Sequence, residues 1–214
     1  MDDKQLIQNL AIFAIPLLFA LTVHEFAHGY IAKLRGDNTA YIAGRLTLNP
    51  AKHIDIWGTI AMPLLLYFST AGTFWFGYAK PIPINTKNFK NYKKDIFVTI
   101  AAGPLSNLIM AFLWGILLTI LLKFQVSEVF FLKMCNYGII INLSLFALNL
   151  FPLLPLDGGR LLLLFLPYKY AVNFSRLEPY GFMIILLLSF STILTKFWLF
   201  PIIKFFSAII SLMF

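Results

Sequence analysis

The residues best suited to chemistry are His24, Glu25 and His28, which form a His-Glu-x-x-His pattern inside an apolar run. Almost every other residue from 10 to 31 is apolar, and ionisable side chains at bilayer depth usually mark a functional site. At about 3.6 residues per turn, the two histidines lie on one helical face and can share a metal. Glu25 then lies beside that metal, where a general base belongs. The alternative is a pair of packing histidines with a structural glutamate, which an apolar helix disfavours.

A hydrolytic zinc site usually has three protein ligands, so the two histidines need a third. Asp157 is the candidate, because it is the carboxylate at the end of a later apolar span and lies between two prolines and Gly158-Gly159. The prolines remove helical hydrogen-bond donors and the glycines permit unusual backbone angles, so we expect the helix to unwind there. The freed backbone groups would be available to hold an extended peptide. Alternatively, these residues form only a turn at a helix end.

The composition predicts an all-α polytopic membrane protein. Of 214 residues, 60% are hydrophobic and 12% are charged, with a mean hydropathy of +0.82. We expect one integral-membrane domain over residues 1–214, with a catalytic core at about 9–160 and a C-terminal helical segment at about 180–214. Cys135 is the single cysteine, which excludes an internal disulfide framework and a cysteine-built metal site. The first residues lack a basic region and a cleavage site, so we expect a retained helix and not a signal peptide.

Apolar stretches of about 20 residues predict five to six transmembrane or re-entrant helices. The expected spans are about 9–32, 96–122 and 134–156, and a further stretch at about 56–79 is broken by proline and glycine. Residues 181–214 form either a short helical hairpin or one helix followed by an interfacial one.

Basic residues predict the orientation of these spans. Twelve of the seventeen Lys and Arg lie in residues 33–94 and 160–176, which places these segments in the cytoplasm. The first helix then runs inward, and both His28 and Asp157 lie near the cytoplasmic face. The stretch 56–79 has basic flanks on both sides, so it must dip in and return, or form two short legs, as a small extended or re-entrant element. It is either a gate or substrate wall, or a structural hairpin. The net charge of +8 does not indicate nucleic acid; the run from Lys87 to Lys94 is an expected anchor for anionic lipid headgroups.

Three motifs together resemble the site-2 protease family of intramembrane zinc metalloproteases. The first is the His-Glu-x-x-His pattern, and the second is Asn-x-x-Pro-x-x-Pro-Leu-Asp-Gly-Gly over residues 149–159. The third, at residues 102–107, is similar to the glycine-to-asparagine motif of the family's middle core helix. Residues 44–50 and 77–85 look like the short, compact bacterial-type members, which have no PDZ or CBS domain.

The resemblance implies one Zn²⁺ per chain, with His24, His28 and Asp157 as its ligands and Glu25 as the base. It also implies Asn149 as a substrate-backbone or oxyanion contact and Asn107 as a polar group near the active site.

Polar side chains in apolar helices are often interhelical hydrogen-bond donors, and this alternative stays open for both asparagines. His53, the third histidine, is a further candidate for a substrate or oxyanion contact, or else a hydrogen-bonded interfacial residue.

The function implied by the resemblance is hydrolysis of peptide bonds in or near the transmembrane segment of a membrane-tethered protein. The substrate must unwind to be cut, and residues 44–48 are either a strand that pairs with it or a surface loop. We expect a multi-pass protein of the cell membrane whose partners are this substrate and the lipid bilayer. One alternative is a catalytically silent zinc-binding scaffold, which does not require Glu25. Another is a metal transporter, which would need ionisable groups on several spans, and the other spans have almost none.

Overall fold

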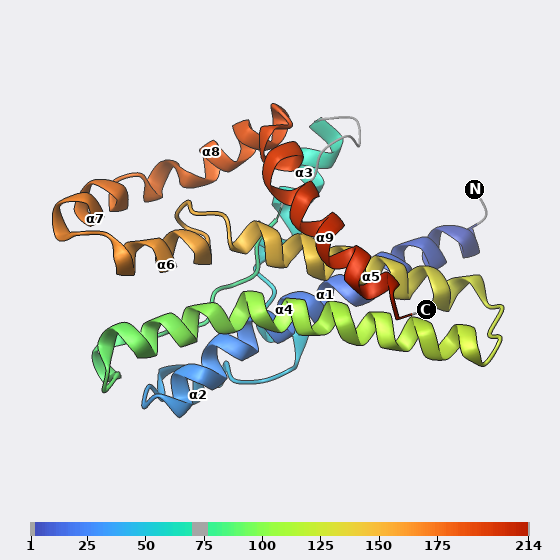
Figure 1. Cartoon of the computed structure of the whole chain (residues 1–214), viewed down its shortest axis with the longest axis horizontal. Coiled ribbons are helices and arrows are strands. Elements are labelled where there is room, and N and C mark those ends of the chain that lie inside the picture. The colour runs from blue at the N-terminus through green and yellow to red at the C-terminus, as the bar shows by residue number, and fades with distance from the viewer. Residues whose placement is uncertain (1–2, 70–76, 214) are drawn as a thin grey trace. The chain divides into compact units, whose positions relative to one another are not determined.

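The computed structural model describes residues 3–69 and 77–213, and within these ranges all regular structure is helical (Figure 1). The chain forms two compact units. Unit 1 comprises Met1–Ala20 and Ile100–Phe214, and unit 2 comprises Leu21–Thr99. The divisions fall inside the two longest helices, α1 (Asp3–Leu34) and α4 (Tyr92–Lys123). The predicted all-α class is confirmed for the described residues.

Three helices are long and apolar enough to cross a membrane: α1, α4 and α5 (Val129–Asn149). A fourth span is possible if α7 (Tyr168–Ser175) and α8 (Glu178–Phe190), bent by 68°, count as one. In the most apolar 18-residue stretch of each of these helices, only 22–39% is buried inside the protein. So much exposed apolar surface is a liability in water but is what a lipid-facing helix requires. The chain is therefore an all-α membrane protein.

The core of unit 1 lies where α4, α5 and α9 (Phe200–Ser211) meet. Its buried apolar residues are Ala111, Leu118, Cys135, Ile139, Leu143 and Ile210. Gly115 admits the side chain of Ile210, and Gly138 admits the ring of Trp114, closer than any Cβ would permit. Lipid tails are as apolar as leucine, so close van der Waals contact at such small residues is what holds membrane helices together.

A buried polar network joins three helices inside unit 1. The Asn107 side-chain amide of α4 donates to the Ala20 carbonyl of α1 at 3.2 Å and to the Asn142 side-chain oxygen of α5 at 3.1 Å. Asn142 in turn donates to the Gly138 carbonyl at 2.8 Å. Both asparagines are fully buried, so Asn107 does act as an interhelical hydrogen-bond donor.

Residues 181–211 contain two helical segments separated by Ser191 and Thr192. The first is α8, and the second combines a π-helix over Thr195–Leu199 with α9. The second segment packs against α5 (Figure 1), and the Trp198 indole N–H donates to the Ala147 carbonyl at 2.7 Å. These contacts favour a two-helix segment joined to the core over a helix followed by a peripheral interfacial one.

In unit 2 the chain continues from the end of α1, and a later segment of it returns to lie beside residues 53–58. A π-helix over Ile56–Ala61 and α3 (Met62–Ser69) follow α2 (Thr39–Ile42) and a short 3₁₀ turn over Pro50–Lys52. The returning segment then bonds to the departing one. Tyr78 N–H donates to the Gly58 carbonyl at 3.0 Å, and Lys80 N–H donates to the His53 carbonyl at 2.9 Å.

This closed path agrees with the predicted return of residues 56–79, although residues 70–76 of that stretch lie outside the described residues. Residues 44–48 form a turn and a bend here and not a strand, and Gly44 has a φ of +65°, which disfavours an extended chain at that point.

Replacing Asn107 with leucine should lower the free energy of unfolding by about 1–3 kcal/mol, because the Asn142 side-chain oxygen loses its buried donor. Asn136→Leu is the matched control. Asn136 lies on α5, as Asn142 does, but it is exposed and donates to the Leu132 carbonyl of its own helix. Its replacement should change stability by less than about 0.5 kcal/mol. Unfolding in mixed micelles measures both, and equal losses in the two variants would contradict the role of the network.

Candidate metal centre

Two histidine nitrogens converge on one face of α1. His24 and His28 are four positions apart in a continuous helix, so their side chains lie one above the other. Their Nε2 atoms are 3.1 Å apart, and the two rings meet edge to face at 85°. Both side chains are buried. The spacing therefore brings together the two predicted ligands that lie in unit 2.

The tautomer of His28 is set by a contact from α4. Its Nδ1 lies 2.8 Å from the Thr99 carbonyl oxygen, also in unit 2. A carbonyl only accepts hydrogen bonds, so Nδ1 carries the proton and Nε2 of the neutral ring keeps its lone pair. Ligating histidines in metal sites are oriented in this way by a partner on the second nitrogen. Sequence reasoning missed Thr99, because a main-chain carbonyl leaves no side-chain signal.

The histidine pair fits a zinc ion. Two nitrogens at about 2.0–2.1 Å from a tetrahedral zinc lie about 3.3–3.4 Å apart, and the observed separation is 3.1 Å. Imidazole nitrogens are also among the ligands that zinc prefers. A shared cation would also account for the burial of two imidazole nitrogens 3.1 Å apart in an apolar helix.

Glu25 is held by the chain that returns along unit 2. Its Oε2 accepts a hydrogen bond from the Ile82 main-chain N–H at 2.8 Å. One turn further along α1, Gly29 leaves room for the Ile82 side chain, which a Cβ at this position would strike. Neither Ile82 nor Gly29 was predicted. The glycine directly after His28 is the signal that could have pointed to a close contact there.

Asp157 is the buried first residue of α6 (Asp157–Phe165) in unit 1. As predicted, the helix before it unwinds: α5 ends at Asn149, and turns occupy 150–156. The expected role of the glycines is wrong, because Gly158 and Gly159 have helical conformations.

The structure gives another reason for the two glycines. A Cβ on Gly158 would strike the Leu150 carbonyl, and one on Gly159 would strike the backbone at 153–154. The absence of side chains therefore lets the start of α6 fold directly onto the preceding turns.

Two of the remaining predicted site residues bond locally. Asn149 ends α5 and donates to the Leu145 carbonyl of the same helix at 3.0 Å. His53 is buried, and its Nε2 lies 2.8 Å from the Thr47 carbonyl, so that nitrogen is the donor. The third, Asn107, lies in the network of unit 1 described above. None of these contacts decides whether the three residues meet substrate, and that role stays a prediction.

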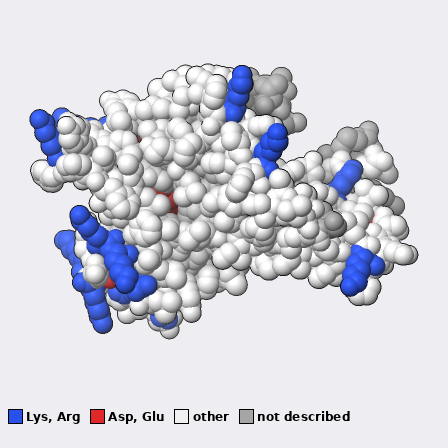
Figure 2. All heavy atoms as spheres, viewed as in Figure 1, with Lys and Arg blue, Asp and Glu red and all other residues white. Residues whose placement is uncertain are grey.

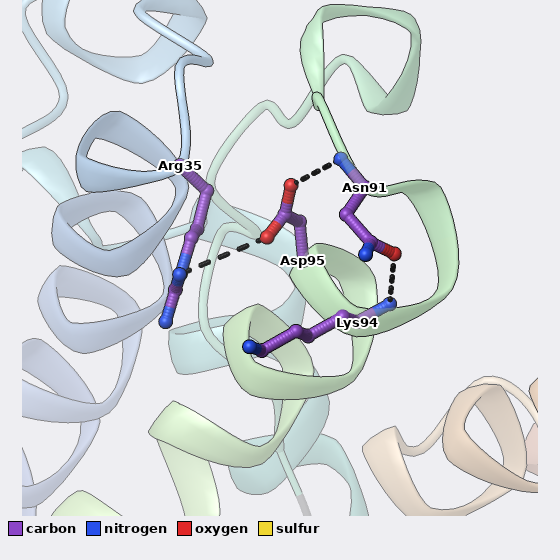
Figure 3. A network of polar contacts seen from close by, with 4 residues as sticks. All are labelled: Arg35, Asn91, Lys94 and Asp95. Atoms are coloured by element: carbon purple, nitrogen blue, oxygen red, sulfur yellow. Dashed lines mark hydrogen bonds and ion pairs between the residues drawn. The ribbon is translucent and has the colours of Figure 1, made fainter.

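A second polar network joins the end of α1 to the start of α4 inside unit 2 (Figure 3). Arg35 Nε lies 3.8 Å from Asp95 Oδ1, and Asp95 Oδ2 accepts from Asn91 N–H at 2.7 Å. The Asn91 side-chain oxygen accepts from Lys94 N–H at 3.4 Å. These contacts fix two helices that also carry His28 and Thr99, so they support the hydrogen bond that orients the His28 ring.

A buried carboxylate ties the polar segment before α4 to the end of α1. Asp37 is fully buried and accepts from Thr39, from Asn85 N–H at 2.7 Å and from the Asn88 amide at 2.8 Å. Burial alone would raise the pKa of Asp37, but the hydrogen bonds from Thr39, Asn88 and Asn85 outweigh it. The net pKa therefore lies below its ordinary value of 3.8.

Because Asp37 and Asp95 are both buried, the exposed charge near them is basic. Blue side chains gather over α2 and the start of α4 in Figure 2. The exposed basic residues of this region are Arg35, Lys87, Lys90, Lys93 and Lys94.

Two curated proteins are similar to this chain. Putative zinc metalloprotease YwhC of Bacillus subtilis (strain 168) is 40% identical over 212 residues, which cover 91% of this chain and 90% of the relative. Putative zinc metalloprotease Rip2 of Mycolicibacterium smegmatis (strain ATCC 700084 / mc(2)155) is 28% identical over 191 residues, covering 88% of this chain and 70% of the relative. No family model and no solved structure matches.

At 40% identity over nearly the whole of both chains, this protein belongs to the same family as YwhC, the site-2 protease-like zinc metalloproteases.

Zinc content should depend on His24 and not on His53. His24→Ala removes one of two converging nitrogens, and we expect zinc affinity to fall by more than about 100-fold, beyond the usual loss for a supporting residue. His53→Ala removes the third histidine, which bonds to Thr47, and should leave the zinc content unchanged. Metal analysis of the purified variants measures this. Full zinc retention in His24→Ala would show that the pair is not the metal centre.

Acid should weaken the folded state through Asp37. A lowered pKa in the folded state means that this stabilisation is complete above the ordinary value of 3.8 and is lost as the pH falls through the folded pKa. Asp37→Asn should lower stability near neutral pH by about 1–3 kcal/mol and make the curve flatter below about pH 4. Unfolding midpoints across this range test the prediction, and parallel curves for wild type and variant would contradict it.

Proposed function

We propose that this protein is an intramembrane zinc endopeptidase that hydrolyses peptide bonds in or near the transmembrane segments of membrane-tethered proteins, in regulated intramembrane proteolysis. The observation that carries the proposal is the convergence of His24 and His28 Nε2 atoms, 3.1 Å apart, within a helix apolar enough to span a membrane. A soluble metalloprotease has no reason to place such a pair in a 28-residue apolar helix.

In the proposed centre, His24, His28 and Asp157 hold one Zn²⁺ per chain. The three side chains are buried and each offers one ligand atom. Two imidazoles and one carboxylate form a typical catalytic zinc set, with one position left open. Burial of Asp157 at the start of a short helix supports its assignment as a ligand and not as a surface residue.

When bound, zinc supplies Lewis acidity toward the scissile carbonyl and lowers the pKa of water to about 7. Glu25 is the proposed general base that takes a proton from the attacking water and later delivers it to the leaving amine. Its neighbours His24 and His28 are ligands, so Glu25 lies next to the site of reaction without being needed as a ligand. The Thr99 carbonyl keeps His28 in the tautomer that can ligate.

We place the protein in the cell membrane as a multi-pass protein, with the active site near the cytoplasmic face. The exposed basic residues next to the C-terminal end of α1 support this orientation, since such residues are enriched on the cytoplasmic side. Anionic lipid headgroups are the proposed partners of this basic surface.

The proposed substrate is a membrane-tethered protein whose transmembrane segment unwinds at the cut. A helical segment has its carbonyls occupied and shielded, so an extended conformation is required. Asn149 at the end of α5 is a proposed substrate contact, because it precedes the unwound residues 150–156, whose backbone is not helical. Asn107 and His53 are further proposed substrate contacts. Asn107 donates to the Ala20 carbonyl and His53 Nε2 donates to the Thr47 carbonyl.

The deciding experiment is cleavage of a single-span reporter by the purified protein in liposomes. Wild type should cut within the span, and a chelator, Glu25→Gln and Asp157→Ala should each lower the rate by at least about 10³-fold, as expected for lost general-base or metal chemistry. Glu25→Gln should keep its zinc, whereas Asp157→Ala should lose it. If all forms keep zinc and none cuts any of several reporters, the scaffold alternative is favoured. If Asp157→Ala retains zinc and activity, the third ligand is wrong.

A further inference from the structure

Main-chain groups of a non-helical segment of unit 2 form hydrogen bonds with several neighbouring segments. We call residues 78–85 the strap. At its start, the Tyr78 carbonyl accepts from the Thr59 hydroxyl at 2.8 Å. In its middle, the Lys80 N–H donates to the His53 carbonyl at 2.9 Å, and the Lys80 carbonyl accepts from Arg45 at 2.9 Å. At its end, the Asn85 N–H donates to buried Asp37. The strap is therefore a fixed part of unit 2.

Between these hydrogen bonds, the strap contacts α1, the helix that carries His24, Glu25 and His28. The Ile82 N–H donates to Glu25 Oε2 at 2.8 Å, joining positions 57 residues apart. A hydrogen bond to an ionised carboxylate is roughly twice as strong as one between neutral groups. It also fixes the direction of a side chain that would otherwise sample several rotamers.

The sequence around Ile82 fixes which N–H makes this bond. Pro81 and Pro83 flank it, and proline has no N–H, so a slip of one residue in either direction would leave Glu25 without a donor. The two rings also hold the backbone φ close to −65°, which keeps the strap extended.

The side chain of Ile82 reinforces the register. It is buried, and its Cδ1 occupies the space that a Cβ on Gly29 would need. Leu46 and Ala40 also border this position on Gly29, at 3.3 Å each from where that Cβ would lie. Gly29 is one turn beyond Glu25, so the N–H and side chain of Ile82 engage the same face of α1.

We infer that Ile82 is a positioning residue: its main-chain N–H holds Oε2 of the catalytic base Glu25, leaving Oε1 to exchange the proton. This inference rests on the proposed function. It assigns to the strap the orientation of the base, which for a proton transfer must be correct to a fraction of an ångström. The strap is held by hydrogen bonds on both sides of Ile82, so it is a permanent support of Glu25. A segment that left the site to admit substrate would have to break these hydrogen bonds at every turnover.

The test removes the Ile82 N–H and keeps the Ile82 side chain. An amide-to-ester replacement at position 82, using the α-hydroxy acid with the isoleucine side chain, exchanges the N–H for an oxygen. The same α-hydroxy acid at Ile84 is the matched control for ester chemistry within the strap. Ile82→Ala is a second variant, which keeps the N–H but shortens the side chain. Each form is assayed as full-length protein on the single-span reporter, with its zinc content measured in parallel.

The ester at position 82 should lower kcat by about 10–100-fold, the usual effect of losing a supporting contact, with KM within about twofold of wild type. Zinc content should not change. The ester at Ile84 should keep kcat within about threefold of wild type, because the Ile82 N–H that donates to Glu25 is still present. Ile82→Ala should lower kcat, but by less than the ester at position 82, because it loses the side-chain contact at Gly29 and keeps the N–H.

Three results would overturn the inference. Unchanged kcat in the position-82 ester would show that the N–H does not orient the base, and a raised kcat would show that the strap blocks the site. Equal losses in the esters at 82 and 84, with lost zinc, would show a purely structural role. If wild type cuts no reporter, the proposed function itself fails, and this outcome is distinct from the other three.

Discussion

The structure depends on one requirement, that every polar group carried by an apolar helix must find a partner within the protein. Lipid offers no hydrogen bonds, and an unsatisfied group at bilayer depth costs several kcal/mol. The few polar side chains in these helices therefore define the contacts between elements. His28 bonds to the Thr99 carbonyl, Asn107 bonds to the Ala20 carbonyl, and Glu25 bonds to the Ile82 N–H. In each case the partner is a main-chain group of a different segment.

Close packing at glycine supplies the complementary constraint. Gly115 and Gly138 bring the helices of unit 1 together, and Gly158 and Gly159 let α6 begin against the turns at 150–154. In unit 2, Gly29 allows the side chain of Ile82 to pack directly against α1. Polar bonds set which segments meet, and the missing side chains set how near they come. A metal centre assembled from separate segments needs both, since ligand positions tolerate little error.

The sequence predicted those features whose signal lies in side chains. The His-Glu-x-x-His spacing identified a buried histidine pair, apolar length identified α1, α4 and α5, and the basic flanks of residues 56–79 indicated a returning segment. Features made by the main chain were not predictable in this way. Neither the carbonyl of Thr99 nor the N–H of Ile82 differs in sequence from any other. The sequence predicted the wrong role for Gly158 and Gly159, because a glycine can indicate either unusual backbone angles or close packing against another backbone segment. The structure shows close packing.

The sequence separation within these contacts bears on how the protein is made. His28 and Thr99 are 71 positions apart, and Glu25 and Ile82 are 57 apart. At about 5–20 residues per second, a ribosome needs about 4–14 s to synthesise the partner of His28 after His28 itself. During that interval His28 has no hydrogen-bond partner from α4. The long apolar remainder of α1 must therefore hold that helix in the membrane until the rest of the chain arrives.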